Sequence, residues 1–171
     1  LKMTGQLIFK SQTLTEFAGG HPIPPLNTPL PNKSTKVIFN FESGDLLYFN
    51  DLRTFGYVKV IPTNEVKDQA FVKALGVEPF SDKFTVQKFK DLIEKRSKMN
   101  IKAFLLDQRY VAGLGNIYTD ETLFFSGVLP TRAVSSLNEL EIVQMHQSIL
   151  HVLNKGIETQ GASKTSYVNL A

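Results

Sequence analysis

The sequence contains the stretch VAGLGNIYTDE at residues 111–121, which decides how the second half of the chain folds. A glycine-bearing turn, Gly113-Leu-Gly115-Asn116, runs directly into a segment typical of a helix. Asn116 is expected to cap that helix, because acidic residues follow in its first turns. Glycines let a backbone approach a bulky anion, and free N–H groups at a helix start favour one. The turn therefore predicts a phosphate site, with ordinary local capping as the alternative.

On both sides of this stretch, the apolar period predicts further helices beyond about residue 64. One short helix should begin after an N-cap at Thr85, and a second should follow Asn100. After Pro130, the sequence Ser136-Leu-Asn-Glu139 predicts a capping box that opens the longest helix, which runs to about Thr159.

The first third of the chain predicts β structure. Alternating apolar residues indicate strands at 37–41 and 46–49, and a third apolar run at 56–61 indicates another. Residues 17–34 are rich in glycine and proline, so we expect a surface loop there. The chain is therefore predicted to be α+β, with a β part at residues 1–64 and a helical part at residues 65–171.

Composition excludes several classes of protein. The 171 residues are 42% hydrophobic and have no cysteine, which excludes a disulfide framework, a thiol nucleophile and a cysteine-ligated zinc within this chain. His146 and His151 are five residues apart and do not share the helical spacing of a metal pair. We find no HExxH motif, nucleophile elbow or nucleotide P-loop. No apolar run reaches the length of a membrane span, and the first residues do not resemble a signal peptide.

Basic residues gather in one segment. The whole chain has 19 basic and 16 acidic side chains. Residues 95–109 hold five basic side chains, Lys98 and Lys102 among them, against Asp107 alone. Such an excess favours contact with a polyanion, although a solvated helix face is the plainer interpretation.

A second candidate site is the loop Asn50-Asp-Leu-Arg-Thr-Phe-Gly56, which joins two predicted strands. Arg53 and Phe55 are two residues apart, so an extended loop would put both side chains on one side. A ring and a guanidinium suit unstacked nucleic acid, where each stacked base is worth about 1–3 kcal/mol. A buried Phe beside a surface Arg in a plain hairpin is the alternative.

These motifs together resemble the formamidopyrimidine-DNA glycosylase family. The resemblance lies in residues 2–5 (KMTG), 50–56 (NDLRTFG) and 111–121, in this order and spacing, with further matches in the connecting segments. It implies a partial antiparallel β-sandwich domain at residues 1–64, followed by an all-helical domain of the helix-two-turn-helix type at residues 65–171.

The resemblance also implies a function in base-excision DNA repair. Such an enzyme flips an oxidised purine, such as 8-oxoguanine or a formamidopyrimidine, out of duplex DNA, cuts its glycosidic bond and nicks the strand by β-elimination. Side chains that fill the vacated stack map onto Met3, Arg53 and Phe55. Phosphate contacts map onto Lys102 and Asn116. Lys98 is expected to be a further phosphate contact, and the turn at Gly113 and Gly115 is expected to position Asn116. The implied partner is double-stranded damaged DNA.

The sequence departs from the family pattern in several places. No residue matches the amino-terminal proline and glutamate that carry the chemistry, so we expect an internal fragment with no catalytic residue, unable to form a covalent imine with abasic DNA. The family's zinc finger is likewise expected outside the chain, which leaves no cofactor within it. Leu52 and Thr54 replace a proline and an arginine, and Ser34 replaces a histidine that contacts DNA.

The rival interpretation is a nucleic-acid-binding module of the helix-two-turn-helix type without catalysis. Such a module has no use for Met3 with Arg53 and Phe55, whereas a base-flipping enzyme needs them. We further expect a monomer with no membrane partner, located in the bacterial cytoplasm with the nucleoid.

Overall fold

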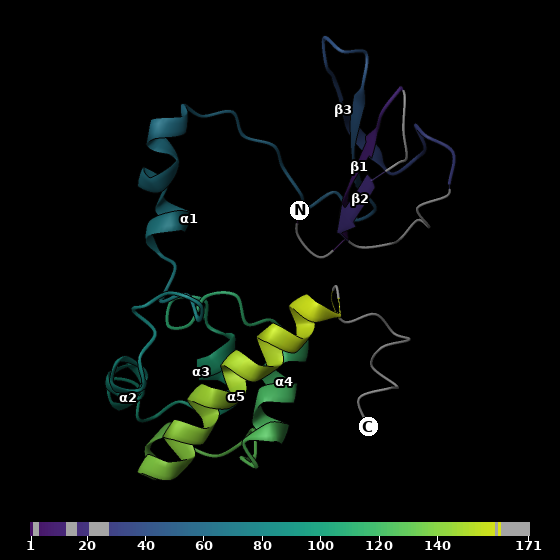
Figure 1. The fold of residues 1–171 in the computed structure, drawn as a ribbon. Helices are drawn as coiled ribbons and strands as arrows, with labels where there is room; N and C mark the ends of the chain where they lie inside the picture. Colours follow the sequence, from purple (N-terminus) through teal and green to yellow (C-terminus); the bar gives the residue numbers. More distant parts are fainter. Residues whose placement is uncertain (2–3, 13–16, 21–27, 160, 162–171) are drawn as a thin grey trace. The chain divides into compact units, whose positions relative to one another are not determined.

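The computed structural model describes residues 1, 4–12, 17–20, 28–159 and 161. The chain divides into two compact units, a sheet unit at Leu1–Pro62 and a helical unit at Thr63–Ala171 (Figure 1). The fold class is α+β, as predicted.

The sheet unit is built on one antiparallel sheet with the strand order β2-β1-β4-β3. Its strands are β1 (Gly5–Lys10), β2 (Phe17–Gly20), β3 (Thr35–Asn40) and β4 (Leu46–Asp51). The central pair, β1 and β4, is in register from Gly5 opposite Asp51 to Lys10 opposite Leu46. The two predicted strands at 37–41 and 46–49 are thus confirmed. The first begins two residues earlier and ends one residue earlier than predicted, and the second extends two residues further.

Two predictions for this unit were wrong. Residues 17–20 form strand β2 instead of a loop: Gly20 has φ +102° and lies so close to the backbone of Gly5 that a side chain would not fit. A glycine pair that suggested a turn therefore serves close strand pairing. Residues 56–61 form no strand, although they are apolar, and Val60 is 93% exposed. Strand propensity takes effect only where a neighbouring backbone is available for pairing.

Polar side chains fill the middle of the sheet unit. Gln6, Asn50 and Asp51 are all buried. Asn50 Nδ2 donates to Gln6 Oε1 at 3.0 Å, and Thr35 Oγ1 donates to Asn50 Oδ1 at 2.7 Å. Buried polar groups need such partners, so this network fixes the end of β4 where the candidate loop begins.

The helical unit contains one long helix, α5, and several shorter helices (Figure 1). Its elements are η1 (Thr63–Asp68), α1 (Ala70–Lys73), α2 (Val86–Glu94), α3 (Ile101–Leu106), α4 (Asn116–Phe125), η2 (Val134–Ser136) and α5 (Glu139–Glu158). Among the described residues, no helix is both long and apolar enough to cross a bilayer.

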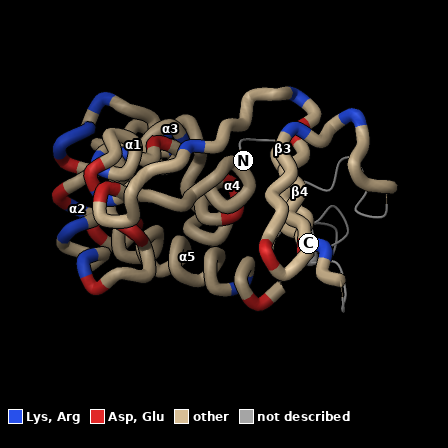
Figure 2. The backbone as a smooth tube through the Cα atoms, turned by 90° about the horizontal axis from the view of Figure 1, so that it is seen from above, with Lys and Arg blue, Asp and Glu red and all other residues tan. Residues whose placement is uncertain are grey.

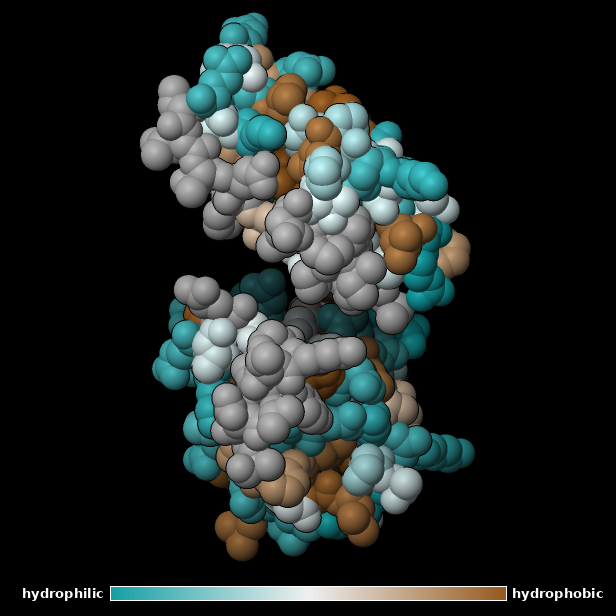
Figure 3. Space-filling model, turned by 90° about the vertical axis from the view of Figure 1, so that its right-hand side faces the viewer, coloured by the Kyte–Doolittle hydropathy of each residue, from teal (hydrophilic) through white to brown (hydrophobic). Residues whose placement is uncertain are grey.

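One apolar core unites α2, α3, α4, η2 and α5, whereas η1 and α1 contribute no buried residue. Phe89, Phe104, Leu114, Met145 and Ile149 are completely buried within it. Burying each such side chain contributes about 1.5–3 kcal/mol. Exposed apolar side chains also occur, and on the face shown in Figure 3 they lie among hydrophilic ones.

Side-chain caps define the starts of α2 and α3, and the predicted cap at Thr85 is confirmed. Thr85 Oγ1 accepts from Lys88 N, and Asn100 Oδ1 accepts from Ala103 N. The prediction for Asn116 was wrong, because Gly115 is the N-cap of α4 and Asn116 is its first helical residue.

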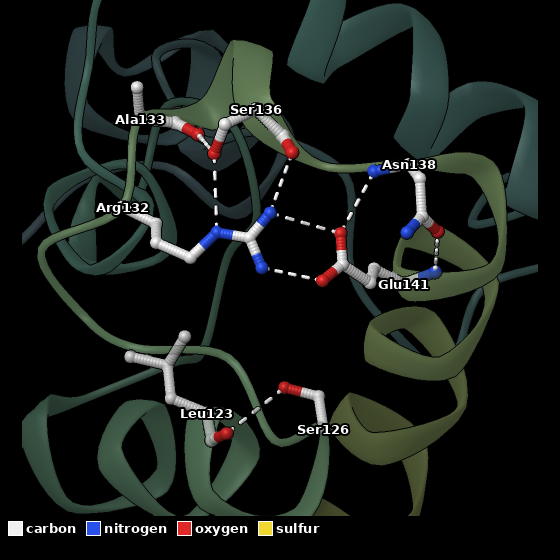
Figure 4. A network of polar contacts seen from close by, with 7 residues as sticks. All are labelled: Leu123, Ser126, Arg132, Ala133, Ser136, Asn138 and Glu141. Carbon is white, nitrogen blue, oxygen red and sulfur yellow. Dashed lines mark hydrogen bonds and ion pairs between the residues drawn. The ribbon is translucent and has the colours of Figure 1, made fainter.

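The capping box of α5 also lies two residues later than predicted. Asn138 is the N-cap: its Oδ1 accepts from Glu141 N at 2.9 Å, and Glu141 returns the contact to Asn138 N. Ser136 belongs to η2 instead, where its carbonyl accepts from Arg132. Arg132 forms a two-pronged ion pair with Glu141 that ties this turn to α5 (Figure 4). The hydrogen bond from Arg132 lowers the pKa of Glu141.

Candidate nucleic-acid interface

The glycine turn before α4 is held by contacts on its inner side. Val77 pairs with Val111, and Ala112 N donates to Val77 O at 3.0 Å. Leu114 is fully buried and acts as the apolar anchor of the turn. Gly113 and Gly115 are exposed, and an added Cβ at either would meet nothing within 4 Å. Gly113 has φ +93°, a conformation that side chains disfavour. The turn thus presents bare backbone outward.

Gln108 is a structural residue of this turn that the sequence analysis missed. Its Oε1 accepts from Gly113 N at 2.8 Å, and its Nε2 donates to Leu114 O at 2.7 Å. One amide side chain thereby replaces the backbone pairing that the turn lacks. A Gln five residues before a glycine turn carries no periodic signal, so only the folded loop reveals this role.

The start of α4 suits an anion. Its N-cap, Gly115, provides no side-chain hydrogen bond to the first N–H groups. Asn116 is exposed at the first helical position, and its amide makes no hydrogen bond with the described residues. Bare N–H groups, the positive end of the helix dipole and an exposed amide donor are together the chemistry that holds a phosphate.

Lys102 lies on α3 and is already paired. Its Nζ is 2.7 Å from Asp120 Oδ1 and 3.0 Å from Oδ2, and both side chains are about one-third exposed (33% and 38%). From the sequence, Asp120 is only one of the acidic residues in the first turns of its helix, and its pairing with Lys102 appears only in the fold. A phosphate at Lys102 must therefore share the ammonium with Asp120 or displace the carboxylate.

The other basic residues of 95–109 differ in their surroundings. Lys98 is exposed in the turn that follows α2. Arg96 Nε donates to Tyr110 Oη at 2.7 Å, and its guanidinium lies 5.1 Å from the centre of that ring. Arg109 forms a two-pronged hydrogen bond with Asp107, which lowers the pKa of Asp107. Basic and acidic segments alternate around α2 in Figure 2, so the excess positive charge of the sequence is partly neutralised locally.

In the sheet unit, Arg53 and Phe55 lie against each other. The guanidinium carbon of Arg53 is 5.0 Å from the centre of the Phe55 ring, and Phe55 is 63% exposed. The expected extended loop is wrong, because Thr54 has φ +59° and bends the chain sharply. The bend nonetheless brings the two side chains together on the surface, in a stacked cation–π arrangement. A buried Phe, as in a plain hairpin, is excluded.

Asp51, at the end of β4, anchors this bend and was also missed. Its Oδ1 accepts from Thr4 Oγ1 at 2.7 Å and from Arg53 N at 3.2 Å, and its Oδ2 accepts from Gly56 N at 2.6 Å. The hydrogen bond from Thr4 is the main cause of a lowered pKa for Asp51. An Asp in a turn sequence is common, and its complete burial appears only in the fold.

The remaining residues singled out from the sequence are placed as follows. Met3 lies outside the described residues. Ser34 is buried and its carbonyl accepts from Asp51 N at 2.8 Å, so it supports the fold. Leu52 and Thr54 are exposed beside Arg53. Arg53 and Phe55 belong to the sheet unit, whereas Lys98, Lys102 and the glycine turn belong to the helical unit.

The described residues do not fit a metal. They contain no group of three His, Asp or Glu side chains that could hold an ion, and the full chain has no cysteine. No step of the chemistry is therefore assigned to a metal held by these residues.

Comparison with known proteins gives the family. Residues 75–168 match the model of the formamidopyrimidine-DNA glycosylase H2TH domain. The formamidopyrimidine-DNA glycosylase of Pelotomaculum thermopropionicum is 36% identical over 169 residues, which cover 99% of this chain and 55% of the relative. That of Shouchella clausii is 42% identical over 137 residues, covering 80% of this chain and 49% of the relative.

Solved structures agree with the sequence relatives. The Lactococcus lactis Fpg in complex with DNA containing an abasic site superposes with a TM-score of 0.78 at 31% identity, covering 95% of this chain and 54% of that one. The chain thus spans about half the length of the relatives it matches. By its helical domain and its sheet alike, the chain belongs to the formamidopyrimidine-DNA glycosylase family.

Proposed function

We propose that the protein acts in base-excision repair as a DNA glycosylase and AP lyase that removes oxidised purines, and that this chain supplies its DNA-binding and void-filling parts. The observation that carries the proposal is the exposed pair of Arg53 and Phe55 at the end of the sheet. The guanidinium carbon of Arg53 lies 5.0 Å from the centre of the Phe55 ring. A module that only grips phosphates gains nothing from an exposed ring stacked with a guanidinium.

The pair suits the space that a flipped nucleotide leaves. An aromatic ring can stack on the neighbouring bases, and a guanidinium can donate hydrogen bonds to the edge of the unpaired base. Phe55 offers its ring to solvent, and Arg53 keeps its donors available above it. In the family resemblance, Arg53 faces the orphaned cytosine, and Met3 completes the set.

The helical unit would hold the strand beside the lesion. Asn116 and the first N–H groups of α4 offer donors to one phosphate, while Lys102 on α3 offers a cation. Such contacts fix the register of protein on DNA without reading sequence. They would keep the strand in place while the lesion base is out of the stack.

Bond cleavage is assigned to groups that match no position of this chain. The resemblance gives the attack on the sugar to an amino-terminal proline and the proton transfer to a glutamate. It also gives a zinc finger to the intact enzyme, and the absence of cysteine means that no residue here can form it. The relatives are bacterial, which supports a location with the DNA in the cytoplasm. The proposal takes the protein to act on duplex DNA as a monomer.

The test is binding of the 171-residue chain to two duplexes of one sequence. One carries a tetrahydrofuran abasic analogue opposite cytosine, and the other is undamaged. We expect at least tenfold tighter binding to the abasic duplex, because an opened stack costs less to fill. Equal affinity for both would contradict the proposal and favour a phosphate-binding module without a role at lesions.

A further inference from the structure

We propose that Asp51 is a positioning residue for base replacement: its carboxylate holds the Arg53–Phe55 bend in the shape that enters the duplex. This inference rests on the proposed function, and it adds a residue for which neither the motif nor the family resemblance gives a role. Asp51 touches no DNA in this proposal and acts through the backbone on either side of it.

The carboxylate brackets the bend from both ends. Oδ1 accepts from Arg53 N at 3.2 Å and Oδ2 accepts from Gly56 N at 2.6 Å, so the residues between them are closed into a loop. Oδ1 also accepts from Thr4 Oγ1 at 2.7 Å, which links the bend to the segment that precedes β1. Two stretches of chain about fifty residues apart therefore meet at one side chain.

Asp51 itself is rigidly placed. Its side chain is completely buried, and its backbone N–H donates to Ser34 O at 2.8 Å. It ends β4 directly opposite Gly5 in the central strand pair. The anchor therefore belongs to the sheet, while the residues that it holds project from the sheet.

Packing does not hold the bend. Leu52, Arg53, Thr54 and Phe55 all have exposed side chains, and Thr54 has a left-handed backbone that β-branched residues disfavour. An exposed loop with an unfavourable conformation persists only where its surroundings determine it. The hydrogen bonds to Asp51, together with the bond from Arg53 N to Thr4 Oγ1 at 3.3 Å, are the contacts that can do so here.

The chemistry needs a carboxylate at this position. A carboxylate has only acceptors and satisfies all three donors, whereas the amide of Asn turns one of its two atoms into a donor. One N–H or O–H of the cluster would then face another donor. The lowered pKa of Asp51 keeps the group ionised at neutral pH.

Gly56 completes the arrangement from the other side. A Cβ at Gly56 would lie 2.5 Å from Phe49 Cζ and 2.9 Å from Asp51 Oδ2. The N–H of residue 56 can reach the carboxylate because no side chain stands between them. The glycine of the motif thus serves the same bracket.

The experiment measures insertion directly with the 171-residue chain. A duplex carries 2-aminopurine opposite the tetrahydrofuran, and its fluorescence rises when protein side chains unstack it. For Asp51→Asn we expect about tenfold weaker binding to this duplex and a fluorescence rise reduced by more than half. Affinity for undamaged duplex, which depends on phosphate contacts, should change by less than twofold.

Asp45→Asn is the matched control. Asp45 lies in the turn between β3 and β4, and its carboxylate accepts from Gln12 N at 3.0 Å and from Ser43 Oγ at 2.7 Å. It is the same substitution in the same unit, at the opposite end of β4. We expect wild-type binding and fluorescence from this variant.

A second pair of variants covers a loss of folding in Asp51→Asn. Thr4→Val removes the hydroxyl that donates to Asp51 and accepts from Arg53 N, and it should reduce the fluorescence rise, whereas Thr4→Ser keeps the hydroxyl and should retain the rise. Circular dichroism establishes that each variant is folded. A full fluorescence rise with both Asp51→Asn and Thr4→Val would overturn the role of Asp51, and so would an equal loss with Asp45→Asn.

The result also separates this inference from the proposed function. A wild-type chain without preference for the abasic duplex would overturn the proposed function itself. A wild-type chain that prefers this duplex, together with unchanged Asp51 variants, would overturn only the positioning role.

Discussion

Lys102 shows how an expected contact residue can be occupied by a neighbour. Its ammonium pairs with Asp120 on the next helix, at 2.7 Å. Pairs of this partly exposed kind contribute about 0–1 kcal/mol, because water competes for both charges. A DNA phosphate can therefore replace Asp120 at small cost, and the carboxylate keeps Lys102 extended toward α4 until then.

We predict opposite effects of the two partners on DNA binding. Asp120→Asn removes the competitor, so the affinity for duplex DNA should rise about threefold at moderate salt. Lys102→Ala removes the cation and should lower the slope of log affinity against log salt by about 0.9, the value for one phosphate contact. Titrations from low to high salt measure both. An unchanged slope in Lys102→Ala would show that Lys102 contacts no phosphate.

The lowered pKa of Asp51 predicts how the stability of the chain depends on pH. This pKa is lowered in the folded chain, chiefly by the Thr4 hydrogen bond, so folding favours the ionised form. The stabilisation is fully present above the unfolded pKa of about 3.9 and is lost as the pH falls through the lower folded pKa. Wild type and Asp51→Asn should therefore differ in unfolding free energy at pH 7 and 5, and the difference should be smaller at pH 2.

Urea unfolding followed by circular dichroism at these three pH values measures the difference. Leu52→Ala, which changes an exposed side chain without charge, is the reference and should give a constant offset. A difference between wild type and Asp51→Asn that stays constant down to pH 2 would contradict the role of the ionised carboxylate.

At the scale of elements, helix starts were predictable only in part. Thr85 and Asn100 cap their helices because a local side-chain hydrogen bond suffices. The same rule predicted the cap of α4 at Asn116, one residue too late, because Gly115 is also an allowed cap residue. The anchored turn at Leu114 decides between them, and it leaves the amide of Asn116 exposed.

The packing of α4 on α5 predicts the effect of adding a side chain at Gly156. A Cβ there would lie 2.6 Å from Tyr118 Oη and 2.7 Å from Cε1. Gly→Ala inside an exposed helix gains about 1 kcal/mol, but overpacking costs about 1–3 kcal/mol. Gly156→Ala should therefore lower the unfolding free energy of the helical unit.

The companion variant tests the cause. Tyr118→Ala opens the space, so Gly156→Ala should stabilise the chain in that background by its helix propensity. Thermal and urea unfolding of the four variants form a double-mutant cycle. A stabilising effect of Gly156→Ala in the wild-type background would contradict the close approach.

At the scale of the whole molecule, the proposal gives two different tasks to the two units. The sheet unit bears the Arg53–Phe55 pair, and the helical unit bears the residues that we propose contact phosphates. One task concerns an opened base stack and the other concerns backbone charge. Stacking depends little on salt, whereas phosphate contact depends on it strongly.

We therefore predict that two variants separate the tasks. Phe55→Ala should reduce the preference for abasic over undamaged duplex about tenfold and leave the salt slope unchanged. Lys102→Ala should flatten the slope and leave the preference unchanged. Binding to both duplexes across a salt series measures the preference and the salt slope of each variant. If each variant changed both the preference and the salt slope, the two tasks would not be separable.

The sequence alone determined the features that depend on local chemistry. Period and caps defined α2, α3 and α5 to within a few residues, the glycine turn before α4 was correctly placed, and Arg53 with Phe55 stood out as neighbours in the loop after the second predicted strand. These features need only contacts between residues close in the chain. The family resemblance rested on the same short stretches.

Only the tertiary structure decided which residues support those features. The role of Gln108 under the glycine turn became visible only in the folded loop. Asp120 beside Lys102 and Asp51 beneath the Arg53–Phe55 bend became visible through contacts between distant segments. Strand β2 formed, and residues 56–61 did not form a strand, for the same reason. Pairing partners and burial are properties of the folded chain, and no periodicity in one segment records them.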